Sequence, residues 1–267
     1  MTRWQESTKH LYDHVDDWLT KYGADANQRL QPRRDGASGE ERFTELVQQH
    51  VRPRDTVVDI GTGDAGWLMK NIAPHVGRAV GFDYAARRLW HGAQERDRLA
   101  AKNVDLLLAD GRRIPMRDGA ADAIINRRGP WTYDDDFMRE GVRILRPGGL
   151  GVEISIGEQN GRELEDAFDE RSQMHEWYAS AEARIDTVPA LYRRFGLEVL
   201  VAESYVCKEV FASREAFFFR LETTPAIDDF DPEVDTPLVD RVIERCATNE
   251  GPALTVHRLC FVGRKVA

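Results

Sequence analysis

Cysteine is scarce in this sequence, and its few cysteines lie far apart. Cys207, Cys246 and Cys260 are the three among 267 residues. An odd number of widely separated cysteines argues against a disulfide framework and predicts a reducing compartment, which we take to be the cytoplasm. No spacing of cysteine and histidine resembles a zinc site, so the sequence predicts no metal centre.

Long apolar runs and an excess of positive charge are also missing. No stretch approaches the roughly 20 apolar residues of a membrane-spanning helix, and we expect no membrane association. Residues 1–10 are polar and lack the apolar segment of a secretion signal. The net charge of -9 argues against a nucleic-acid partner, because phosphate binding needs clustered Lys or Arg. A local basic patch and the oligomeric state stay open.

A glycine-rich turn is the most informative motif that is present. The apolar residues Val57 and Val58 lead into Asp59-Ile60-Gly61-Thr62-Gly63, and residues 65–72 can form a helix. This pattern predicts a buried strand that opens onto a tight turn, where glycine lets the backbone approach a ligand closely. A strand, glycine turn and helix in this order usually hold a nucleotide-like cofactor.

The turn alone does not identify the cofactor. Gly61, Gly63 and Gly66 fit the spacing G-x-G-x-x-G of dinucleotide-binding proteins. Asp59 precedes the turn, however, and Asp64 follows it, where a pyrophosphate would favour a positive helix end. Both acids suit a cofactor without phosphate, although neither excludes a dinucleotide.

Four further strands are predicted after the turn. The second ends at Asp83, about 20 residues past the glycines, where an acid typically binds both ribose hydroxyls. The third also ends in an acid, Asp110. A helical stretch then reaches Arg146-Pro147-Gly148-Gly149, a stop signal before the fifth strand. The predicted strands cover residues 78–83, 105–110, 122–126 and 150–156.

Taken together, these motifs resemble class I S-adenosylmethionine-dependent methyltransferases. The resemblance spans about residues 55–155. It implies an α/β, Rossmann-like, seven-stranded, mostly parallel sheet with helices on both faces, plus N-terminal helices and helical insertions near the C-terminus. The motifs that carry it are Val57 to Gly63, Gly81 to Asp83, Ala109-Asp110, Ile114-Pro115, Asp118-Gly119, Asp122 to Asn126, and Leu145 to Gly149.

The resemblance also implies a role for each cofactor-binding residue. The methionine end of S-adenosylmethionine would face the turn, the ribose would bind the second acid, and the adenine would meet the third acid and its neighbour. An aromatic after the second strand would pack on the adenine or serve ordinary packing. The residues are Asp59, Gly61, Thr62 and Gly63 for methionine, Asp83 for ribose, Tyr84, Asp110 and Gly111 for adenine, and Asn126 for the amino group.

The chain outside these motifs is expected to form one domain, residues 1–267, with added helices. We divide it into N-terminal helices that serve as a lid (1–52), the cofactor core (53–157), a helical acceptor-side insertion (158–196) and C-terminal strands with a further insertion (197–267). Expected helices cover residues 8–22, 39–51, 160–179, 213–221 and 237–246, with another that breaks near Pro189. The last two strands are expected at 197–206 and 254–262, and loops at 31–38 and 228–235.

Methyl transfer to an acceptor requires neither a metal nor a covalent intermediate, because the sulfonium already activates the methyl group. Much of the catalysis can come from positioning, and a base matters only where the acceptor must lose a proton. We therefore assign no catalytic residue. Trp131 is expected to form an apolar wall or to pack internally, and Arg127 and Arg128 to bind an acidic group or to offset residues 134–136. The acceptor-side candidates are Tyr12, Arg127, Trp131, His175 and Trp177.

Four functions remain open from the sequence. The acidic charge and aromatic-rich insertions favour a methyltransferase that acts on an O, N or C atom of a small molecule. An RNA or protein methyltransferase would need a basic groove at the cofactor mouth. A cofactor-binding protein without catalysis is disfavoured by the intact motifs, as is an NAD-dependent oxidoreductase.

Overall fold

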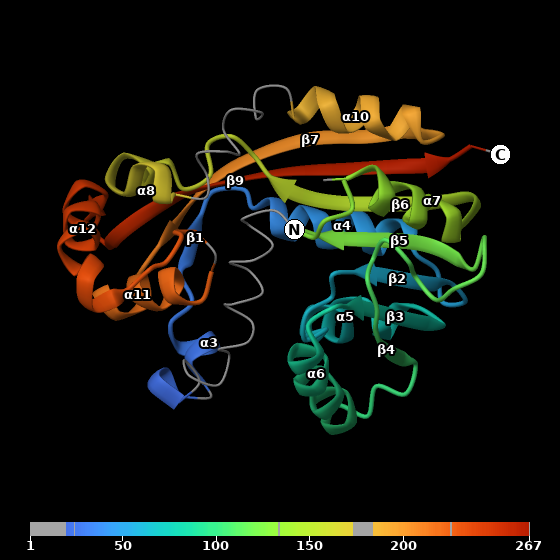
Figure 1. Ribbon diagram of the computed structural model, residues 1–267, viewed down its shortest axis with the longest axis horizontal. Coiled ribbons are helices and arrows are strands. Elements are labelled where there is room, and N and C mark those ends of the chain that lie inside the picture. The colour runs from blue at the N-terminus through green and yellow to red at the C-terminus, as the bar shows by residue number, and fades with distance from the viewer. Residues whose placement is uncertain (1–19, 24, 133, 173–183, 225, 267) are drawn as a thin grey trace. The chain divides into compact units, whose positions relative to one another are not determined.

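The computed structural model describes residues 20–23, 25–132, 134–172, 184–224 and 226–266 (Figure 1). The chain divides into two compact units, each made of separate segments. The unit that we call the sheet unit comprises Gly39–Ile156, Ala183–Ser204 and Arg258–Ala267. The one that we call the helical unit comprises Met1–Ser38, Gly157–Glu182 and Tyr205–His257.

Parallel strands form the centre of the sheet unit. Their apolar runs fit strands that are covered on both faces, and four pairs of neighbours are parallel: β2 with β3, β3 with β4, β2 with β5, and β5 with β6. Strand β9 pairs with the outer edge of β6 in antiparallel orientation. The order is β7-β9-β6-β5-β2-β3-β4. The bounds are β2 Thr56–Ile60, β3 Arg78–Asp83, β4 Val104–Leu108, β5 Ala121–Arg127, β6 Leu145–Ile156, β7 Leu197–Val210 and β9 Gly251–Lys265.

Helices cover both faces of this sheet. On one face, Val58 and Ile60 of β2 share a core with side chains of α7 and α10, among them Met138 and Tyr192. Because side chains alternate along a strand, Val57 faces the other side. On that side α4 and α5 meet through stacked aromatic rings. The helices are α4 Gly39–His50, α5 Gly66–Asn71, α6 Ala86–Arg98, α7 Asp135–Ile144 and α10 Arg184–Arg194, with a 3-10 turn, η1, at Ala73–His75.

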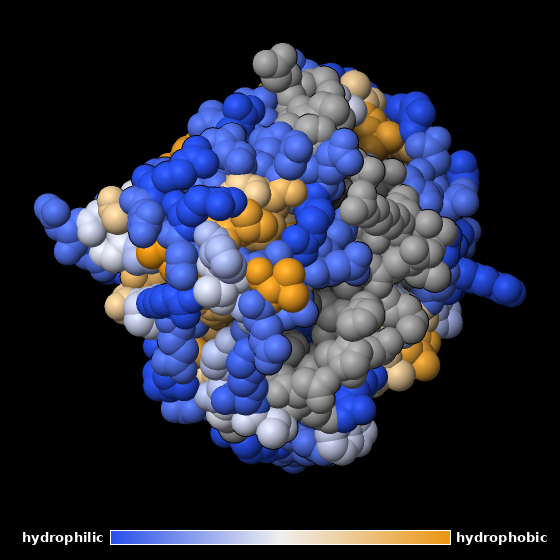
Figure 2. All heavy atoms as spheres, turned by 60° about the vertical axis from the view of Figure 1, so that its left-hand side comes forward, coloured by the Kyte–Doolittle hydropathy of each residue, from blue (hydrophilic) through white to orange (hydrophobic). Residues whose placement is uncertain are grey.

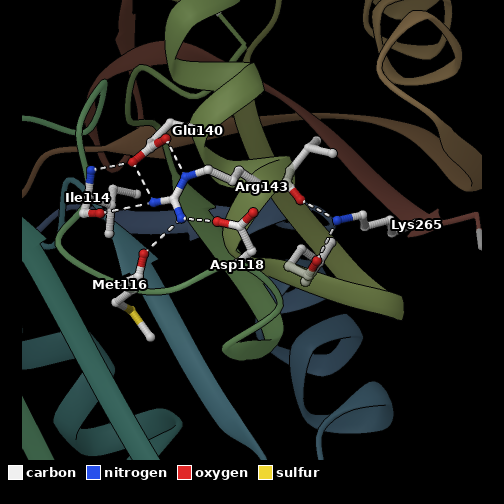
Figure 3. Close-up of polar contacts among 8 residues, drawn as sticks. Ile114, Met116, Asp118, Glu140, Arg143 and Lys265 are labelled. Carbon is white, nitrogen blue, oxygen red and sulfur yellow. Dashed lines mark hydrogen bonds and ion pairs between the residues drawn. The ribbon is translucent and has the colours of Figure 1, made fainter.

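The loop between β4 and β5 is fastened to α7 by the guanidinium of Arg143 (Figure 3). This group donates to the Met116 carbonyl at 2.8 Å, to Asp118 Oδ1 at 2.6 Å and to the Ile114 carbonyl at 3.0 Å. Glu140, one turn earlier in α7, accepts from Arg143 at 2.7 Å and from the Ile114 N–H at 2.6 Å. The loop that carries two predicted cofactor residues is thereby held at both its backbone and its side chains.

The two ends of α7 are closed by side chains. Asp134 caps the start, because its carboxylate accepts from the N–H groups of Asp136 and Phe137. At the other end, Lys265 of β9 donates to the carbonyls of Val142 and Leu145 at 2.7 Å each (Figure 3). Carbonyls at the end of a helix lack intrahelical partners. A lysine there supplies hydrogen-bond donors to them, and its positive charge interacts favourably with the negative end of the helix dipole.

The helical unit has an aromatic core of its own. Phe211 and Phe217 are fully buried, with their rings 5.0 Å apart. Ser213 caps α11 by accepting from the Ala216 N–H at 3.1 Å. Figure 2 brings α11 and α12 forward and shows a mostly hydrophilic face with small hydrophobic areas. The elements are α3 Ala26–Arg29, β1 Arg33–Asp35, α8 Arg162–Phe168, η2 Asp169–Arg171, α11 Arg214–Glu222, α12 Pro232–Arg245 and β8 Ala247–Thr248.

The predicted α/β class, with helices on both faces of the sheet, is confirmed. The predicted parallel order holds for the central strands, whereas β1 pairs antiparallel with β7, and β9 pairs antiparallel with β6 and β8. The seven expected strands are present, and the described residues add two short ones. β1 lies in the expected loop 31–38 and pairs with β7, and β8 pairs with β9. Among the described residues, no helix combines the length and apolar composition needed to cross a bilayer.

Three predicted helices have other limits in the structure. The expected helix 160–179 was wrong in its described part, because α8 ends at Phe168 and Asp169 takes a left-handed φ of +47°. Pro189 lies inside α10 without breaking it, since the buried Tyr192 keeps the helix packed. The expected loop 228–235 already contains the start of α12, which Asp231 caps. Residues 8–19 lie outside the described residues.

Replacing Arg143 with alanine should lower the free energy of unfolding by about 2–3 kcal/mol, because several charge-assisted hydrogen bonds to one loop are lost together. Urea denaturation provides the measurement. Arg139→Ala is the matched control, because Arg139 lies on the same helix, is exposed, and pairs with Asp136 at 2.5 Å. An exposed pair of this kind contributes at most about 1 kcal/mol. Equal effects of the two substitutions would contradict the anchoring role.

Candidate functional site

The turn after β2 is closed by two glycines with left-handed backbone. Gly61 has φ +75° and Gly63 has φ +62°, a region that residues with side chains disfavour. The N–H groups of Gly61 and Thr62 both donate to the Phe82 carbonyl at 2.9 Å. The turn is therefore fastened to the end of the neighbouring strand, β3.

Asp83 lies buried beneath this turn at the end of β3. One of its oxygens accepts from the Gly63 N–H at 2.7 Å, and the other accepts from the Ala85 N–H at 2.8 Å. Each carboxylate oxygen can accept more than one hydrogen bond. The arrangement thus fixes the orientation of the carboxylate and leaves capacity for hydroxyl donors.

Asp59 is buried at the end of β2 and is only half satisfied. Its Oδ2 accepts from the Thr62 hydroxyl at 2.8 Å, whereas its Oδ1 is buried without a partner. Burial raises the pKa of Asp59 to about 6, against the lowering effects of the Thr62 hydrogen bond and the charge of Arg127. A buried acceptor in this state is energetically costly unless a ligand supplies the missing donor.

Asn126 provides a second buried acceptor on the adjacent strand, β5. Its Nδ2 donates to the Gly129 carbonyl at 3.2 Å, but its Oδ1 has no partner. Asp59 pairs in register with Ile125, the residue before Asn126. Two unpaired acceptor oxygens therefore belong to the carboxyl ends of neighbouring parallel strands, where ligands bind in open α/β sheets.

The loop after β4 brings Asp110 and Gly111 to the same edge. A Cβ on Gly111 would lie 2.8 Å from the Phe137 ring and 3.3 Å from Ile60, so the packing leaves room only for glycine. Asp110 accepts from the Arg112 guanidinium at 2.7 Å, and this hydrogen bond lowers the pKa of the carboxyl. Unlike Asp83, Asp110 is partly exposed and paired.

Tyr84 and Trp131 have opposite environments. Tyr84 is 49% exposed beside Asp83, which leaves its ring accessible to a ligand. Trp131 is 0% exposed, with its ring 5.6 Å from that of Tyr192, and it overlies Gly141 and Gly151, where any Cβ would overlap the indole. The expectation of an acceptor wall at Trp131 was therefore wrong, because the two glycines create an internal space that the indole fills.

Arg127 is the last residue of β5 and Arg128 follows it, and their charge partner is not the one considered from the sequence. Both approach Glu40 of α4, at 3.9 Å and 3.4 Å respectively. The nearby acids are engaged elsewhere, since Asp135 pairs with Arg194 and Asp136 with Arg139. The two arginines therefore do not offset those acids.

Some acceptor-side residues fall outside the described part of the chain, and others were not foreseen. Tyr12, His175 and Trp177 lie outside the described residues. Glu40 and Arg258 were missed, although Arg258 Nε donates to Glu40 Oε1 at 3.0 Å. Glu40 reads as an ordinary acid in the first turn of a helix, and its partners lie 87 or more residues away in sequence. The local sequence signal for these ion pairs was the pair Arg127 and Arg128, directly after the strand predicted at residues 122–126.

Known proteins share this architecture and these motifs. A family profile described as "Methyltransferase domain" matches residues 58–152. A ubiquinone/menaquinone biosynthesis C-methyltransferase of Pseudomonas savastanoi pv. phaseolicola is 30% identical over 127 residues, which cover 45% of this chain and 48% of that protein. The chain thus spans about half the length of the curated relatives it matches.

Solved structures share the fold across more of the chain. A proposed methyltransferase of Bacillus halodurans has a TM-score of 0.60 at 16% identity, covering 85% of this chain and 100% of that one. Geranyl diphosphate C-methyltransferase from Streptomyces coelicolor, in complex with Mg²⁺, geranyl diphosphate and S-adenosyl-L-homocysteine, has a TM-score of 0.51 at 17% identity, covering 85% and 79%. At these identities the likeness is one of fold.

The matched segment contains the glycine turn and the ends of β2, β3 and β5 described above. This segment lies within residues 58–152, which match the methyltransferase-domain profile. The resemblance of this part of the chain to class I S-adenosylmethionine-dependent methyltransferases is confirmed by the family profile, the curated relative and the shared fold.

The burial of Trp131 leads to a prediction about stability. Trp131→Ala should lower the free energy of unfolding by about 3–5 kcal/mol, because it leaves a large cavity in the core. Chemical denaturation followed by circular dichroism measures the change. Trp90→Ala, at a residue 58% exposed on α6, is the control and should change stability far less. Comparable stabilities of the two variants would place Trp131 outside the core.

Proposed function

We propose that this protein transfers a methyl group from S-adenosylmethionine to an O, N or C atom of a small-molecule acceptor. The observation that carries the proposal is the pair of buried, unpaired acceptor oxygens, on Asp59 and Asn126, beside a glycine turn. Their missing hydrogen-bond donors match the ammonium group at the methionine end of this cofactor, which donates three hydrogen bonds. Burial makes these contacts stronger than they would be in water.

The remaining parts of the cofactor have matching residues as well. Asp83 is oriented by two backbone N–H groups and can accept from both hydroxyls of a ribose. Asp110 and the N–H of Gly111 are placed for the adenine edge, and the exposed ring of Tyr84 offers a stacking face. Gly111 admits no side chain, which keeps the backbone close to any ligand there.

When bound, the cofactor supplies a methyl carbon activated by the positive charge on sulfur. The protein's part is to bind and orient: Asp59 and Asn126 hold the amino group, and Asp83 holds the ribose. Holding two reactants in line removes most of the entropic part of the barrier. We assign no base, because one is needed only where the acceptor must lose a proton.

Small acceptors are supported by the named relatives. The Pseudomonas relative is named for ubiquinone and menaquinone biosynthesis, and the Streptomyces structure holds geranyl diphosphate. Ubiquinone, menaquinone and geranyl diphosphate are all small compared with an RNA or a protein. Cys207, Cys246 and Cys260 form no disulfide, which further supports a reducing compartment, and we propose the cytoplasm.

Asp83→Ala should weaken binding of S-adenosylhomocysteine at least about 10-fold, because two charge-assisted hydrogen bonds to the ribose are lost. Isothermal titration calorimetry measures the dissociation constant, with NAD tested as a competitor that should not bind. Asp105→Ala is the control: Asp105 lies on the adjacent strand and pairs with Arg78 at 2.7 Å. An unchanged affinity in Asp83→Ala, or displacement by NAD, would contradict the assignment.

The raised pKa of Asp59 predicts that cofactor binding depends on pH. An ammonium ligand requires the carboxylate form, so affinity should be constant above the pKa of about 6. Below it, affinity should fall by up to about tenfold per pH unit, because binding must first remove a proton. Calorimetry with S-adenosylhomocysteine between about pH 5 and pH 8 tests this proton linkage. Asp59→Asn should bind weakly and lose the dependence.

The ligand-free protein should show the opposite trend in its stability. A carboxyl whose pKa is higher in the folded state than in the unfolded state destabilises the fold as pH rises between the two values. Asp59→Asn should therefore be at least as stable as the unchanged protein near neutral pH. A loss of stability in Asp59→Asn would mean that the buried carboxylate is a structural element instead of a ligand.

A further inference from the structure

Three arginines of the sheet unit converge on a single carboxylate. Arg127 ends β5, Arg128 follows it, and Arg258 lies in β9 with a side chain that is only 3% exposed. Their guanidinium groups lie 3.9 Å, 3.4 Å and 3.0 Å from oxygens of Glu40. We call these three residues the arginine cluster. Its positive charges outnumber the carboxylate that they share.

The three arginines differ in how they contact Glu40. Arg258 donates to Glu40 at 3.0 Å, so this pair is formed. Arg127 and Arg128 approach Glu40 only at ion-pair distance, and no side-chain hydrogen bond joins either one to a described residue. Both are about one third exposed, at 33% and 32%. A guanidinium has five N–H donors in a fork that matches carboxylates and phosphates.

The pKa directions agree with a surplus of positive charge. Burial alone would raise the pKa of Glu40, but the charges of Arg128, Arg258 and Arg127 hold it well below its usual range. Burial and the charge of Arg128 together lower the pKa of Arg127, although Glu40, Asp59 and Asp64 act in the other direction. The charges of the three arginines thus act on one another as well as on Glu40.

The free donors are held in place by packing. The Arg127 guanidinium lies 5.4 Å from the centre of the Trp67 ring, which itself stacks on Phe43 of α4 at 5.1 Å. Arg128 takes a left-handed φ of +62°, a conformation that most residues avoid. A strained backbone and a stacked side chain reduce the entropy lost when a ligand binds.

The same loop contacts the glycine turn of the cofactor site. A Cβ on Gly61 would lie 3.4 Å from Pro130 and 3.6 Å from Gly129, the two residues after the twin arginines. A Cβ on Gly129 would lie 2.8 Å from the carbonyl of Ile60 and would overlap Asn126. Arg127 and Arg128 therefore directly follow Asn126, which we assign to the cofactor site.

We propose that Arg127 and Arg128 bind an anionic group, a carboxylate or a phosphate, on the acceptor molecule. The inference rests on the proposed methyltransferase function and specifies the substrate class of that site. Arg258 stays with Glu40 and leaves the two exposed guanidinium groups to form a fork for the anion. An acceptor that lacks a negative charge would leave the positive charge uncompensated and bind weakly.

Calorimetry with small probe anions tests this proposal. Benzoate and phenyl phosphate represent the two kinds of anionic group, and benzyl alcohol is the neutral comparison. The protein is first saturated with S-adenosylhomocysteine, so that the carboxylate of the cofactor occupies its own site. One of the two anions should bind, more weakly as salt rises, and benzyl alcohol should not. Binding of the alcohol as tightly as the anions, or of none of the three, would overturn the proposal.

Variants then locate the binding. Arg128→Asn keeps a residue that tolerates the left-handed backbone. This variant and the single variant Arg127→Gln should each weaken anion binding at least about 10-fold. At about pH 8, where Asp59 stays ionised, the affinity for S-adenosylhomocysteine should stay within about twofold, because the cofactor contacts are made by other residues. Arg139→Gln, an exposed arginine on α7, is the matched control. Unchanged anion binding in Arg127→Gln and Arg128→Asn contradicts the proposal. Weaker cofactor binding with unchanged anion binding in these two variants contradicts it as well.

Glu40→Gln provides a test with the opposite sign. Glu40 competes with an incoming anion for the two arginines, so its neutralisation should tighten anion binding, whereas a purely structural carboxylate would leave it unchanged or weaker. Should Arg128→Asn fail to fold, Arg127→Gln and Glu40→Gln decide the matter. A protein that does not bind S-adenosylhomocysteine would refute the proposed function separately, because probe binding can be measured without the cofactor.

Discussion

Parallel pairing between β2 and β3 is the constraint on which the site depends. Its register sets Asp59 opposite Gly81 and Ile60 opposite Phe82, so the two strands end side by side. The Phe82 carbonyl then accepts from the turn after β2, and Asp83 accepts from Gly63. A shift of one residue in either strand would turn the acid of that strand to the other face of the sheet. The arrangement of the acids is thus a consequence of strand register.

A ligand site of this kind conflicts with the stability of the empty protein. Unpaired acceptors on Asp59 and Asn126 would each be better satisfied in water. The surrounding core compensates for them, because the apolar side chains of β2 and β5, such as Val58, Ile60 and Ile124, are buried. Proteins commonly accept such local strain where a ligand relieves it.

Much of the sheet unit could be predicted from the sequence, because its signals are local. Apolar runs that end in an acid or an asparagine marked β2, β3 and β5, and the glycines marked the turn. The ion pairs of Arg127 and Arg128 with Glu40 could not be predicted, since they join residues far apart in the chain. Trp131 was assigned to the wrong environment because nothing local shows that Gly141 and Gly151 leave space for an indole.

The fit of Trp131 against two glycines has a consequence for how the protein can evolve. Its indole joins the loop after β5 to α7 and β6, so none of the three positions can change size alone. The twin arginines, in contrast, sit on the same loop with their side chains partly exposed. Substitutions there leave the core intact. Selection can therefore change residues 127 and 128, which we propose to bind the acceptor, while the tryptophan and its glycines keep the loop in place.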